Sequence, residues 1–319
     1  MKVLITGVTG FIASEIARTL VKENDVEVAC LVRISSNSNM FDPIKDIINH
    51  LDIRYGNLSD YHSIKKIVKD VSPNYILHLG AQTSVSHSFG NPLEFNEVNY
   101  LGTINLIHAA LEVSSFKKFI FASTMESYGW QSQRKPFKED LPLNPASPYS
   151  ASKVACEVYI KMAHKAFGLP YIICRCCNTY GRKFSTGFIT EYIANTMLKN
   201  KDLYLGTPNA VRDMMHYTDH VNAYITALRS NKSNDTFNFG TGSKTPMKEI
   251  ASKLKKLTGF KGKIIHSFPP NYPWRPVVED FLSLDASKAK KVLGWAPKVS
   301  LDDGLKTMVK YWKQKSGIT

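Results

Sequence analysis

The chain has 319 residues, of which 43% are hydrophobic and 21% charged, proportions typical of globular proteins. This length predicts one large domain or two joined ones. No run of about 18 apolar residues is present, so no transmembrane helix and no membrane partner are expected. The opening MKVLITGVTG is typical of a strand and a loop, not of a signal peptide.

The net charge of +14 raises the question of a nucleic-acid partner. The lysines form short clusters at helical spacing with apolar neighbours, as in KLKKLTGFKGK, which is typical of solvated helix faces. No helix-turn-helix, zinc finger or RNA-recognition motif accompanies them. We therefore expect no nucleic-acid partner, although a basic field would also attract a diphosphate.

The five cysteines are odd in number, and three of them lie in the apolar run YIICRCC. Zinc would need a second pair of ligands. We interpret the cysteines as buried thiols of a reducing, cytoplasmic compartment. His78, His216 and His220 have no third ligand nearby in the sequence and are interpreted as structural, so no metal site is predicted.

Short apolar runs alternate with helical patterns along the first half of the chain. This alternation predicts βαβ units, and hence an α/β fold with a doubly wound parallel sheet of the Rossmann type. Strands are expected at 2–6, 26–32, 53–55, 75–80, 118–123 and 171–176, and helices at about 12–22, 61–70, 92–113 and 149–167.

After about residue 178 the pattern loosens into loops and helices, with one late strand at 236–240. We expect a Rossmann domain over 1–177 and about 210–242. A smaller C-terminal α/β substrate domain is expected over about 178–209 and 243–319. No linker, internal repeat or low-complexity segment marks the boundary between them.

The stretch TGVTGFIA places Gly7 and Gly10 between the first strand and the first helix. Such a turn lets backbone N–H groups and a helix N-terminus approach a phosphate, and a tight turn without a ligand is the alternative. After the second strand, LVRISSN carries Arg33 where an acid would bind the ribose of NAD. An arginine there accommodates a 2′-phosphate, so NADP is the expected cofactor and NAD the alternative.

Tyr149 and Lys153, in PYSASK, are one helical turn apart and share a helix face. A lysine ammonium beside a phenol lowers the phenol pKa. The phenolate can then take a proton from a sugar hydroxyl while hydride leaves the carbon for a nicotinamide. Such a pair occurs often by chance, but it gains weight when it follows a Rossmann start.

These motifs, with GNLSD, HLGAQTSV, NYLGT, STMESYG and NTYG, resemble the extended short-chain dehydrogenases/reductases that act on nucleotide sugars. LVRISSN, LYLGTPNAVRDMMHYTDHVNAY and RPVVEDFLSLDASKAKKVLGWAPK most resemble GDP-mannose 4,6-dehydratases. The resemblance implies a lyase of carbohydrate biosynthesis that oxidises C4, eliminates water across C5 and C6 and returns the hydride to C6. A 4-epimerase, a 4-dehydrogenase or a non-catalytic NADP-binding protein is the alternative.

The resemblance also implies catalytic roles. Thr124 would hydrogen-bond the sugar 4-hydroxyl and Glu126 would remove the C5 proton, beside Tyr149 and Lys153. Met125 stands where related dehydratases carry an Asp acid or a Ser, and a thioether can neither donate nor relay a proton. Either Glu126 serves as both base and acid, or the enzyme stops before elimination.

Further contacts are implied by the same resemblance. Val278 stands where the GDP-mannose enzymes carry a ribose-binding Glu, with Glu279 next to it, so the nucleotide base is left open. Substrate contacts are implied for Ser84, Asn178, Lys183, Arg212 and Arg275, the two arginines gripping the diphosphate. Cofactor contacts are implied for Gly7, Thr9, Gly10, Phe11, Ile12, Arg33, Ser36, Asn57, Leu58, Leu79, Ala81, Tyr149 and Lys153.

In this family, helices matching about 97–113 and the one that starts near Tyr149 build a four-helix bundle between subunits. A homodimer or a dimer of dimers is therefore expected. Apolar residues beyond one stripe fit this role, although they could instead fill a monomer core: Leu106, Ile107, Ala110, Val154, Val158 and Ile160.

Overall fold

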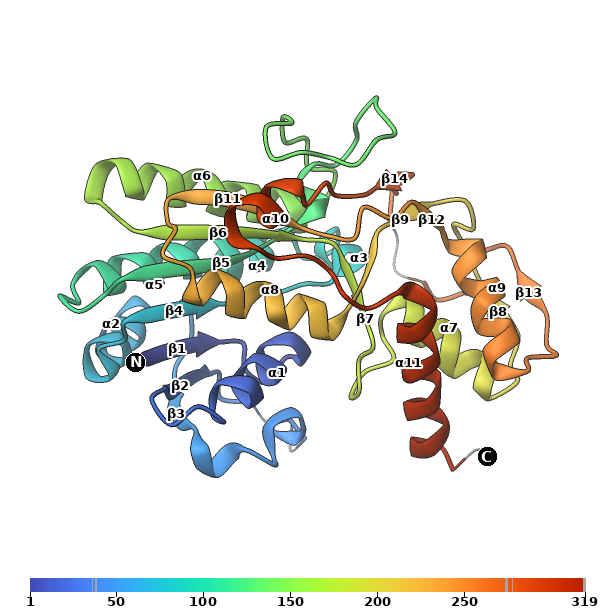
Figure 1. The fold of residues 1–319 in the computed structure, drawn as a ribbon, viewed down its shortest axis with the longest axis horizontal. Helices are drawn as coiled ribbons and strands as arrows, with labels where there is room; N and C mark the ends of the chain where they lie inside the picture. Colours follow the sequence, from blue (N-terminus) through green and yellow to red (C-terminus); the bar gives the residue numbers. More distant parts are fainter. Residues whose placement is uncertain (36, 38, 273–274, 277, 318–319) are drawn as a thin grey trace.

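The structure is a computed structural model that describes residues 1–35, 37, 39–272, 275–276 and 278–317. The predicted cofactor contact of Ser36 lies outside these residues. The centre of the fold is a parallel sheet in the order β11-β6-β5-β4-β1-β2-β3 (Figure 1), which confirms the expected doubly wound α/β architecture. Its strands are β1 (Lys2–Thr6), β2 (Glu27–Val32), β3 (Asp52–Tyr55), β4 (Tyr75–His78), β5 (Lys118–Thr124), β6 (Tyr171–Cys176) and β11 (Asp235–Phe239).

Helices cover both faces of the sheet, as Figure 1 shows. In β1, Val3 and Ile5 pack on one face and Leu4 on the other, because successive side chains of a strand point in opposite directions. The first face carries α1 (Phe11–Leu20) and α8 (Tyr217–Arg229); the second carries α2 (Tyr61–Val71), α5 (Gly102–Leu111) and α6 (Pro148–Phe167).

The helix predicted over 92–113 is interrupted. α4 (Pro92–Phe95) runs into a π-helical turn, Asn96–Leu101, before α5 begins. The Asn99 side chain accepts a hydrogen bond from Gln82 N at 2.8 Å and donates one to Gln82 O at 3.0 Å. Asn99 thereby fixes the loop that follows β4, and π turns often occur at functional sites. Hydrophobic periodicity does not reveal this extra residue in the turn.

A second group of elements follows β6. Its helices share a separate core around Ile193, Leu254 and Met308, to one side of the large sheet in Figure 1. These helices are α7 (Ile189–Leu198), α9 (Met247–Thr258) and α11 (Leu301–Lys315). Two small sheets join this group to the large one: β7 (Asn178–Tyr180) with β10 (Met214–His216), and β9 (Val211–Arg212) between β12 (Thr245–Pro246) and β14 (Phe281–Leu282). The remaining elements are α3 (Val85–Ser88), β8 (Leu203–Tyr204), β13 (Ile264–Ile265) and α10 (Ser287–Leu293).

The predicted domain boundaries stay a prediction, and the packing adds one observation to them. The prediction places Phe281, Leu284 and Trp295 in the substrate domain, yet they pack in the same hydrophobic core as α1 and α8. The chain therefore returns to the Rossmann core after residue 243.

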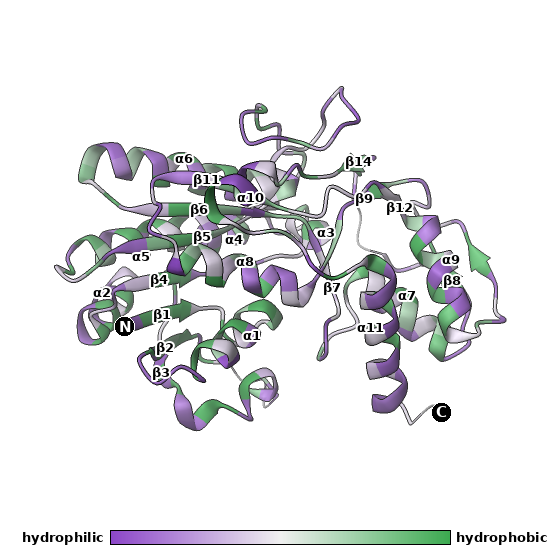
Figure 2. Ribbon diagram, viewed as in Figure 1, coloured by the Kyte–Doolittle hydropathy of each residue, from purple (hydrophilic) through white to green (hydrophobic). Residues whose placement is uncertain are grey.

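Hydrophobic residues are concentrated in the inner strands, whereas α11 contains many hydrophilic residues (Figure 2). All five cysteines are free and buried, as predicted. Within the described ranges, no helix has the length and apolarity needed to cross a membrane.

Candidate active site

Gly7 and Gly10 form the turn between β1 and α1. Gly7 has φ +78°, and a Cβ at this position would lie 2.8 Å from the Gly80 backbone, so a side chain there would collide with the loop after β4. Gly10 caps α1 without a side-chain hydrogen bond, which leaves the N–H groups of the first turn available to an anion. The turn therefore fits the phosphates of a dinucleotide. The other residues predicted to contact the cofactor here are Thr9, Phe11 and Ile12.

The next predicted cofactor residues lie where parallel strands end. Arg33 follows β2 and is exposed, Asn57 and Leu58 follow β3, and Leu79 and Ala81 follow β4. Because these strands are parallel, their carboxyl ends meet at one edge of the sheet (Figure 1). The structure thus brings these residues to the same edge as the glycine turn.

His78 links β1 to α5 through a continuous series of hydrogen bonds. Thr103 Oγ1 donates to Asn99 O at 2.5 Å and therefore accepts from His78 Nε2 at 3.0 Å. His78 Nδ1 then accepts from Thr6 Oγ1 at 2.7 Å, and this hydroxyl accepts from Gly80 N at 2.9 Å. Burial lowers the pKa of His78 to about 3, so the ring stays neutral. This network agrees with a structural role and holds the loop against which Gly7 packs.

The two other histidines also have hydrogen-bond partners inside the fold. His216 Nδ1 lies 2.8 Å from Thr218 Oγ1, and His220 Nδ1 contacts Thr179 Oγ1. Burial lowers the pKa of both, that of His220 to about 3. Across the part of the chain that the structure describes, no group of three or more His, Cys, Asp or Glu side chains could hold a metal ion.

Glu126 lies in a single 3₁₀ turn, Met125–Ser127, at the end of β5. Thr124 caps this turn, since its Oγ1 accepts a hydrogen bond from Glu126 N at 3.2 Å. The Glu126 side chain is buried, with 8% of the residue exposed, and its Oε2 has no hydrogen-bond partner among the described residues. A solvated loop acid would show neither property.

Glu126 faces a second acid and two arginines. Its pKa is raised to about 7, first by burial and then by the charge of Glu279, while Arg212 and Arg275 oppose the rise. Arg275 Nη2 lies 2.8 Å from Glu279 Oε2, and Arg212 Nη2 donates to Glu279 O at 2.8 Å. The structure thus brings together the predicted base and the two predicted diphosphate arginines. Glu279 joins them, although the sequence assigned it no role.

Tyr149 and Lys153 lie in the first turns of α6, which begins with a capping box of Ser147 and Ser150. Lys153 Nζ donates to Ala122 O at 2.8 Å, and burial lowers the pKa of Lys153 to about 8. The expectation of a lowered pKa for Tyr149 is wrong for this arrangement. The pKa of Tyr149 is raised by burial and then by the nearby Glu126, and the hydrogen bond with Thr124 opposes this.

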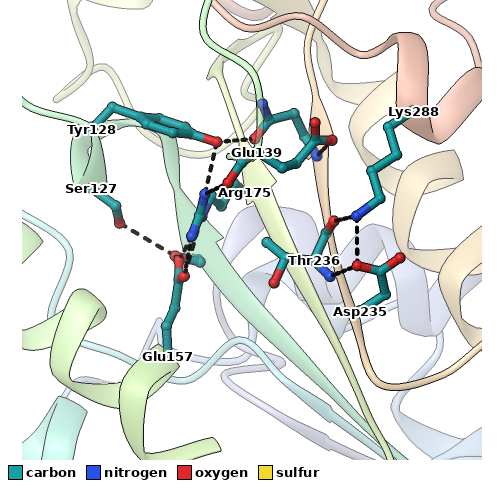
Figure 3. Close-up of polar contacts among 10 residues, drawn as sticks. Ser127, Tyr128, Glu139, Glu157, Arg175, Asp235, Thr236 and Lys288 are labelled. Atoms are coloured by element: carbon teal, nitrogen blue, oxygen red, sulfur yellow. Dashed lines mark hydrogen bonds and ion pairs between the residues drawn. The ribbon is translucent and has the colours of Figure 1, made fainter. Parts of the chain in front are cut away.

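A buried network lies behind the Glu126 turn (Figure 3). Arg175 Nη2 lies 2.6 Å from Glu157 Oε2, and Arg175 Nη1 donates to the Tyr128 hydroxyl oxygen at 2.8 Å. Ser123 Oγ donates to Glu157 Oε1 at 2.5 Å. The Arg175 and Glu157 side chains are 2% and 1% exposed, so each charge depends on the other. Sequence reasoning missed this pair, because each residue lies in an ordinary strand or helix pattern.

The remaining predicted substrate residues lie in different surroundings. Lys183 Nζ is 3.1 Å from Glu15 Oε1, so Lys183 is held at α1, the helix of the glycine turn. Ser84 caps α3 by accepting a hydrogen bond from His87 N at 3.4 Å. Asn178 begins β7, and its buried Oδ1 has no partner among the residues that the structure describes, which leaves it available to a ligand.

The glycine turn, the strand-end loops and the Tyr149–Lys153 pair together define a dinucleotide-binding Rossmann protein of the short-chain dehydrogenase/reductase class. Comparison with known proteins identifies the family within this class. The family model described as GDP-mannose 4,6 dehydratase matches residues 4–308. The chain therefore belongs to this family, within the extended short-chain dehydrogenases/reductases that act on nucleotide sugars.

Similar proteins include both dehydratases and epimerases. A putative UDP-glucose 4-epimerase of Methanocaldococcus jannaschii is 32% identical, over 98% of this chain and 99% of its own. The dTDP-D-glucose 4,6-dehydratase of Bos taurus is 31% identical, over 98% and 89%. Among solved structures, the UDP-glucose 4-epimerase of Thermotoga maritima with UDP-glucose has a TM-score of 0.88 at 29% identity, covering 99% of this chain and 100% of its own. The UDP-glucose 4-epimerase of Thermus thermophilus in complex with NAD has a TM-score of 0.87 at 28% identity, covering 98% and 99%.

Proposed function

We propose that this protein is a nucleotide-sugar 4,6-dehydratase that uses a nicotinamide dinucleotide. The observation that carries the proposal is the buried Glu126 carboxyl at the end of β5, with a pKa of about 7. A base with such a pKa is suited to accept a proton near neutral pH and to give it back. A 4-epimerase has no use for a base at this position, because the C5 proton of its substrate is not touched.

The side chains divide the reaction into steps. Tyr149 takes the proton of the 4-hydroxyl, for which its phenol must first ionise against the burial that raises its pKa. Thr124 holds the same hydroxyl by a hydrogen bond. A ketone at C4 acidifies the C5 proton, and Glu126 removes that proton. Arg212 and Arg275 grip the diphosphate with their planar forks. The Gly7 turn would hold the dinucleotide, whose nicotinamide would supply the hydride chemistry between C4 and C6.

For the cofactor we propose NADP, on the strength of the exposed Arg33 after β2. NAD is the alternative, supported by the NAD complex of the similar Thermus epimerase. GDP-mannose is the first substrate to test because of the matched family, followed by UDP-, dTDP- and CDP-hexoses. The buried, free cysteines support a reducing, cytoplasmic compartment.

We further propose a homodimer or a dimer of dimers built on α5 and α6. Four of the apolar residues named for this role, Leu106, Ile107, Ala110 and Ile160, are buried in the monomer and fill its core. Other apolar side chains of the same region remain exposed and support the proposal. They are Leu101 at 50%, Val158 at 62% and Met162 at 38%.

A 4-epimerase is the second candidate, and Met125 favours it. Met125 is buried, 1% exposed, at the place where related dehydratases carry an acid. Without a proton donor at this place the C6 hydroxyl is a poor leaving group. The epimerase names among the similar proteins point the same way.

The Glu126→Gln variant tests the dehydratase proposal, because it separates the two half-reactions. It keeps the shape of the side chain but cannot accept the proton. We expect the variant to bind nucleotide sugar and form reduced cofactor, seen in the dihydronicotinamide absorbance band. Deuterium exchange at C5 and loss of water should fall by about 10² to 10⁴-fold. Tyr149→Phe is the matched control, since it should prevent formation of reduced cofactor as well. Water loss at the wild-type rate in Glu126→Gln would refute the proposal.

A further inference from the structure

Glu279 is a buried acid whose second oxygen is available. Only 1% of the residue is exposed, and Oε1 has no hydrogen-bond partner among the described residues. Its Oε2 is held by Arg275 at 2.8 Å. Arg212 fixes its backbone from β9, because Arg212 Nη2 donates to Glu279 O at 2.8 Å. A buried carboxyl with one free oxygen needs a partner or a proton.

The partner that the structure provides is Glu126. The two carboxyl groups lie close enough to form a hydrogen bond once one of them carries a proton, and Glu126 also keeps one oxygen, Oε2, without a partner among the described residues. Two carboxylates this close cannot both be ionised without a large cost, so they favour a state with one shared proton. Among the described residues, the charged or titratable groups that act on Glu126 include Glu279, Arg212, Arg275 and Tyr149.

With the diphosphate at Arg275 and C5 at Glu126, as proposed above, the shape of a pyranose would put Glu279 near one particular carbon. C1, which carries the diphosphate, and C5 are the two carbons that flank the ring oxygen. Glu279 pairs with Arg275, a predicted diphosphate ligand, and faces Glu126, the proposed base at C5. A group between these two positions lies beside the ring oxygen and the C6 hydroxymethyl, which projects from C5.

We propose that Glu279 is the catalytic acid that protonates the departing C6 hydroxyl, using a proton that it shares with Glu126. This inference rests on the proposed dehydratase function. It supplies the proton donor that Met125 cannot be. Val278 marks the position of the ribose-binding acid in the resembling enzymes, so Glu279 is not assigned by that correspondence.

Side chains of the protein and the solvent supply and accept every proton that this step needs. Glu126 as carboxylate takes the C5 proton, the C5–C6 double bond forms, and the C6–O bond breaks as Glu279 gives its proton to the oxygen, which leaves as water. Glu126 later returns a proton to C5. Glu279 recovers its proton from solvent, to which Tyr149 releases the proton taken from the 4-hydroxyl.

Substrate binding can place the shared proton correctly. Without substrate, Glu279 is paired with Arg275, while burial and the charge of Glu279 raise the pKa of Glu126. A diphosphate that binds Arg275 and Arg212 competes for this positive charge. The proton then moves toward Glu279, which leaves Glu126 as the base. Binding of the substrate diphosphate would thus leave Glu279 protonated, as the acid, and Glu126 ionised, as the base.

The shared proton is tested without turnover. Protein carrying ¹³C-labelled glutamate carboxyls is titrated from pH 5 to 9 by infrared difference spectroscopy, and the band missing in Glu126→Gln is assigned to Glu126. In Glu279→Gln the Glu126 band should titrate at lower pH than in wild type, because a like charge is gone. Asp280→Asn, at the adjacent exposed residue paired with Arg134, should leave it unchanged. An unshifted Glu126 titration in Glu279→Gln would overturn the shared proton, whatever the activity.

The acid role is tested by separating exchange from water loss. Glu279→Gln should still form reduced cofactor and exchange the C5 proton with deuterium from solvent, while loss of water falls by about 10² to 10⁴-fold. Met125→Asp added to Glu279→Gln should restore loss of water. If Glu279→Gln instead weakens nucleoside diphosphate binding and slows every step equally, Glu279 binds the nucleotide and the proposal is wrong.

The acid role can still be tested if Glu279→Gln does not fold, and it fails if wild type has no dehydratase activity. If Glu279→Gln does not fold, Glu279→Asp keeps the acid on a shorter side chain and should slow loss of water more than C5 exchange; equal slowing would count against the acid role. If wild type removes water from no nucleotide hexose, the dehydratase function fails and with it the acid role. The infrared result then still decides whether the two carboxyls share a proton.

Discussion

Burying Glu126 costs stability at neutral and alkaline pH, and Glu126→Gln should recover that stability. The pKa of this carboxyl is about 7 in the folded protein against an ordinary value of 4.5. Below pH 4.5 the group is protonated in both states and costs nothing. As the pH rises from 4.5 to 7, the unfolded state ionises while the folded state does not, so stability falls. At about 1.4 kcal/mol per pH unit, this gap corresponds to about 3 kcal/mol.

Urea denaturation of wild type and Glu126→Gln at pH 5 and pH 8 measures this effect. Other buried acids titrate in both proteins, so the informative quantity is the difference between them. Glu126→Gln should be more stable than wild type by about 3 kcal/mol at pH 8, with a smaller gain at pH 5. Glu97→Gln, at an exposed position of the π turn, is the control and should show no such change with pH. A gain from Glu126→Gln that is the same at both pH values would refute the buried, raised-pKa carboxyl.

Three further predictions concern the cofactor, the buried network and the assembly. Arg33→Asp should weaken NADP binding by about 10- to 100-fold and NAD binding much less, measured by fluorescence titration of the reduced cofactors; equal weakening would contradict the 2′-phosphate role. Arg175→Met should lower the free energy of unfolding, measured by urea denaturation, by about 3–5 kcal/mol, because Glu157 is left buried and unpaired. The double variant with Glu157→Met should recover much of this loss. No recovery would show that the loss comes from packing and not from the unpaired charge. Val158→Asp should convert the proposed dimer to a monomer in light scattering at micromolar concentration, and a wild-type monomer would rule out the dimer itself.

The sequence predicted the features that local physics determines. Each strand of the large sheet that was expected from the sequence is present. The inner strands were predictable because a strand buried on both faces needs a continuous run of apolar residues, whereas β3 is a half-exposed edge strand. Gly7 was predicted from its place after β1, and the structure gives the reason, since only glycine tolerates both its φ and the approach of Gly80. Parallel strands then bring the loops that follow them to one edge without further information.

The features that the sequence did not reveal depend on contacts between distant segments. Glu279 lies beside Arg212 because β14 pairs with β9, and nothing in either local pattern signals that pairing. The Ala122 carbonyl that accepts a hydrogen bond from the Lys153 ammonium is another such contact, because it lies at the end of β5 and helical spacing does not reveal it. Burial, which raises the pKa of Tyr149, is likewise a property of the folded chain.

The most direct test of dehydration follows one hydrogen atom. Nucleotide hexoses deuterated at C4, with GDP-mannose first, are incubated with the purified protein, and the product is examined by mass spectrometry and NMR. A 4,6-dehydratase returns the hydride that it removes, so the product should be lighter by one water and carry the deuterium at C6. A product of unchanged mass, with deuterium still at C4 and the configuration of that carbon inverted, would contradict dehydration and identify an epimerase.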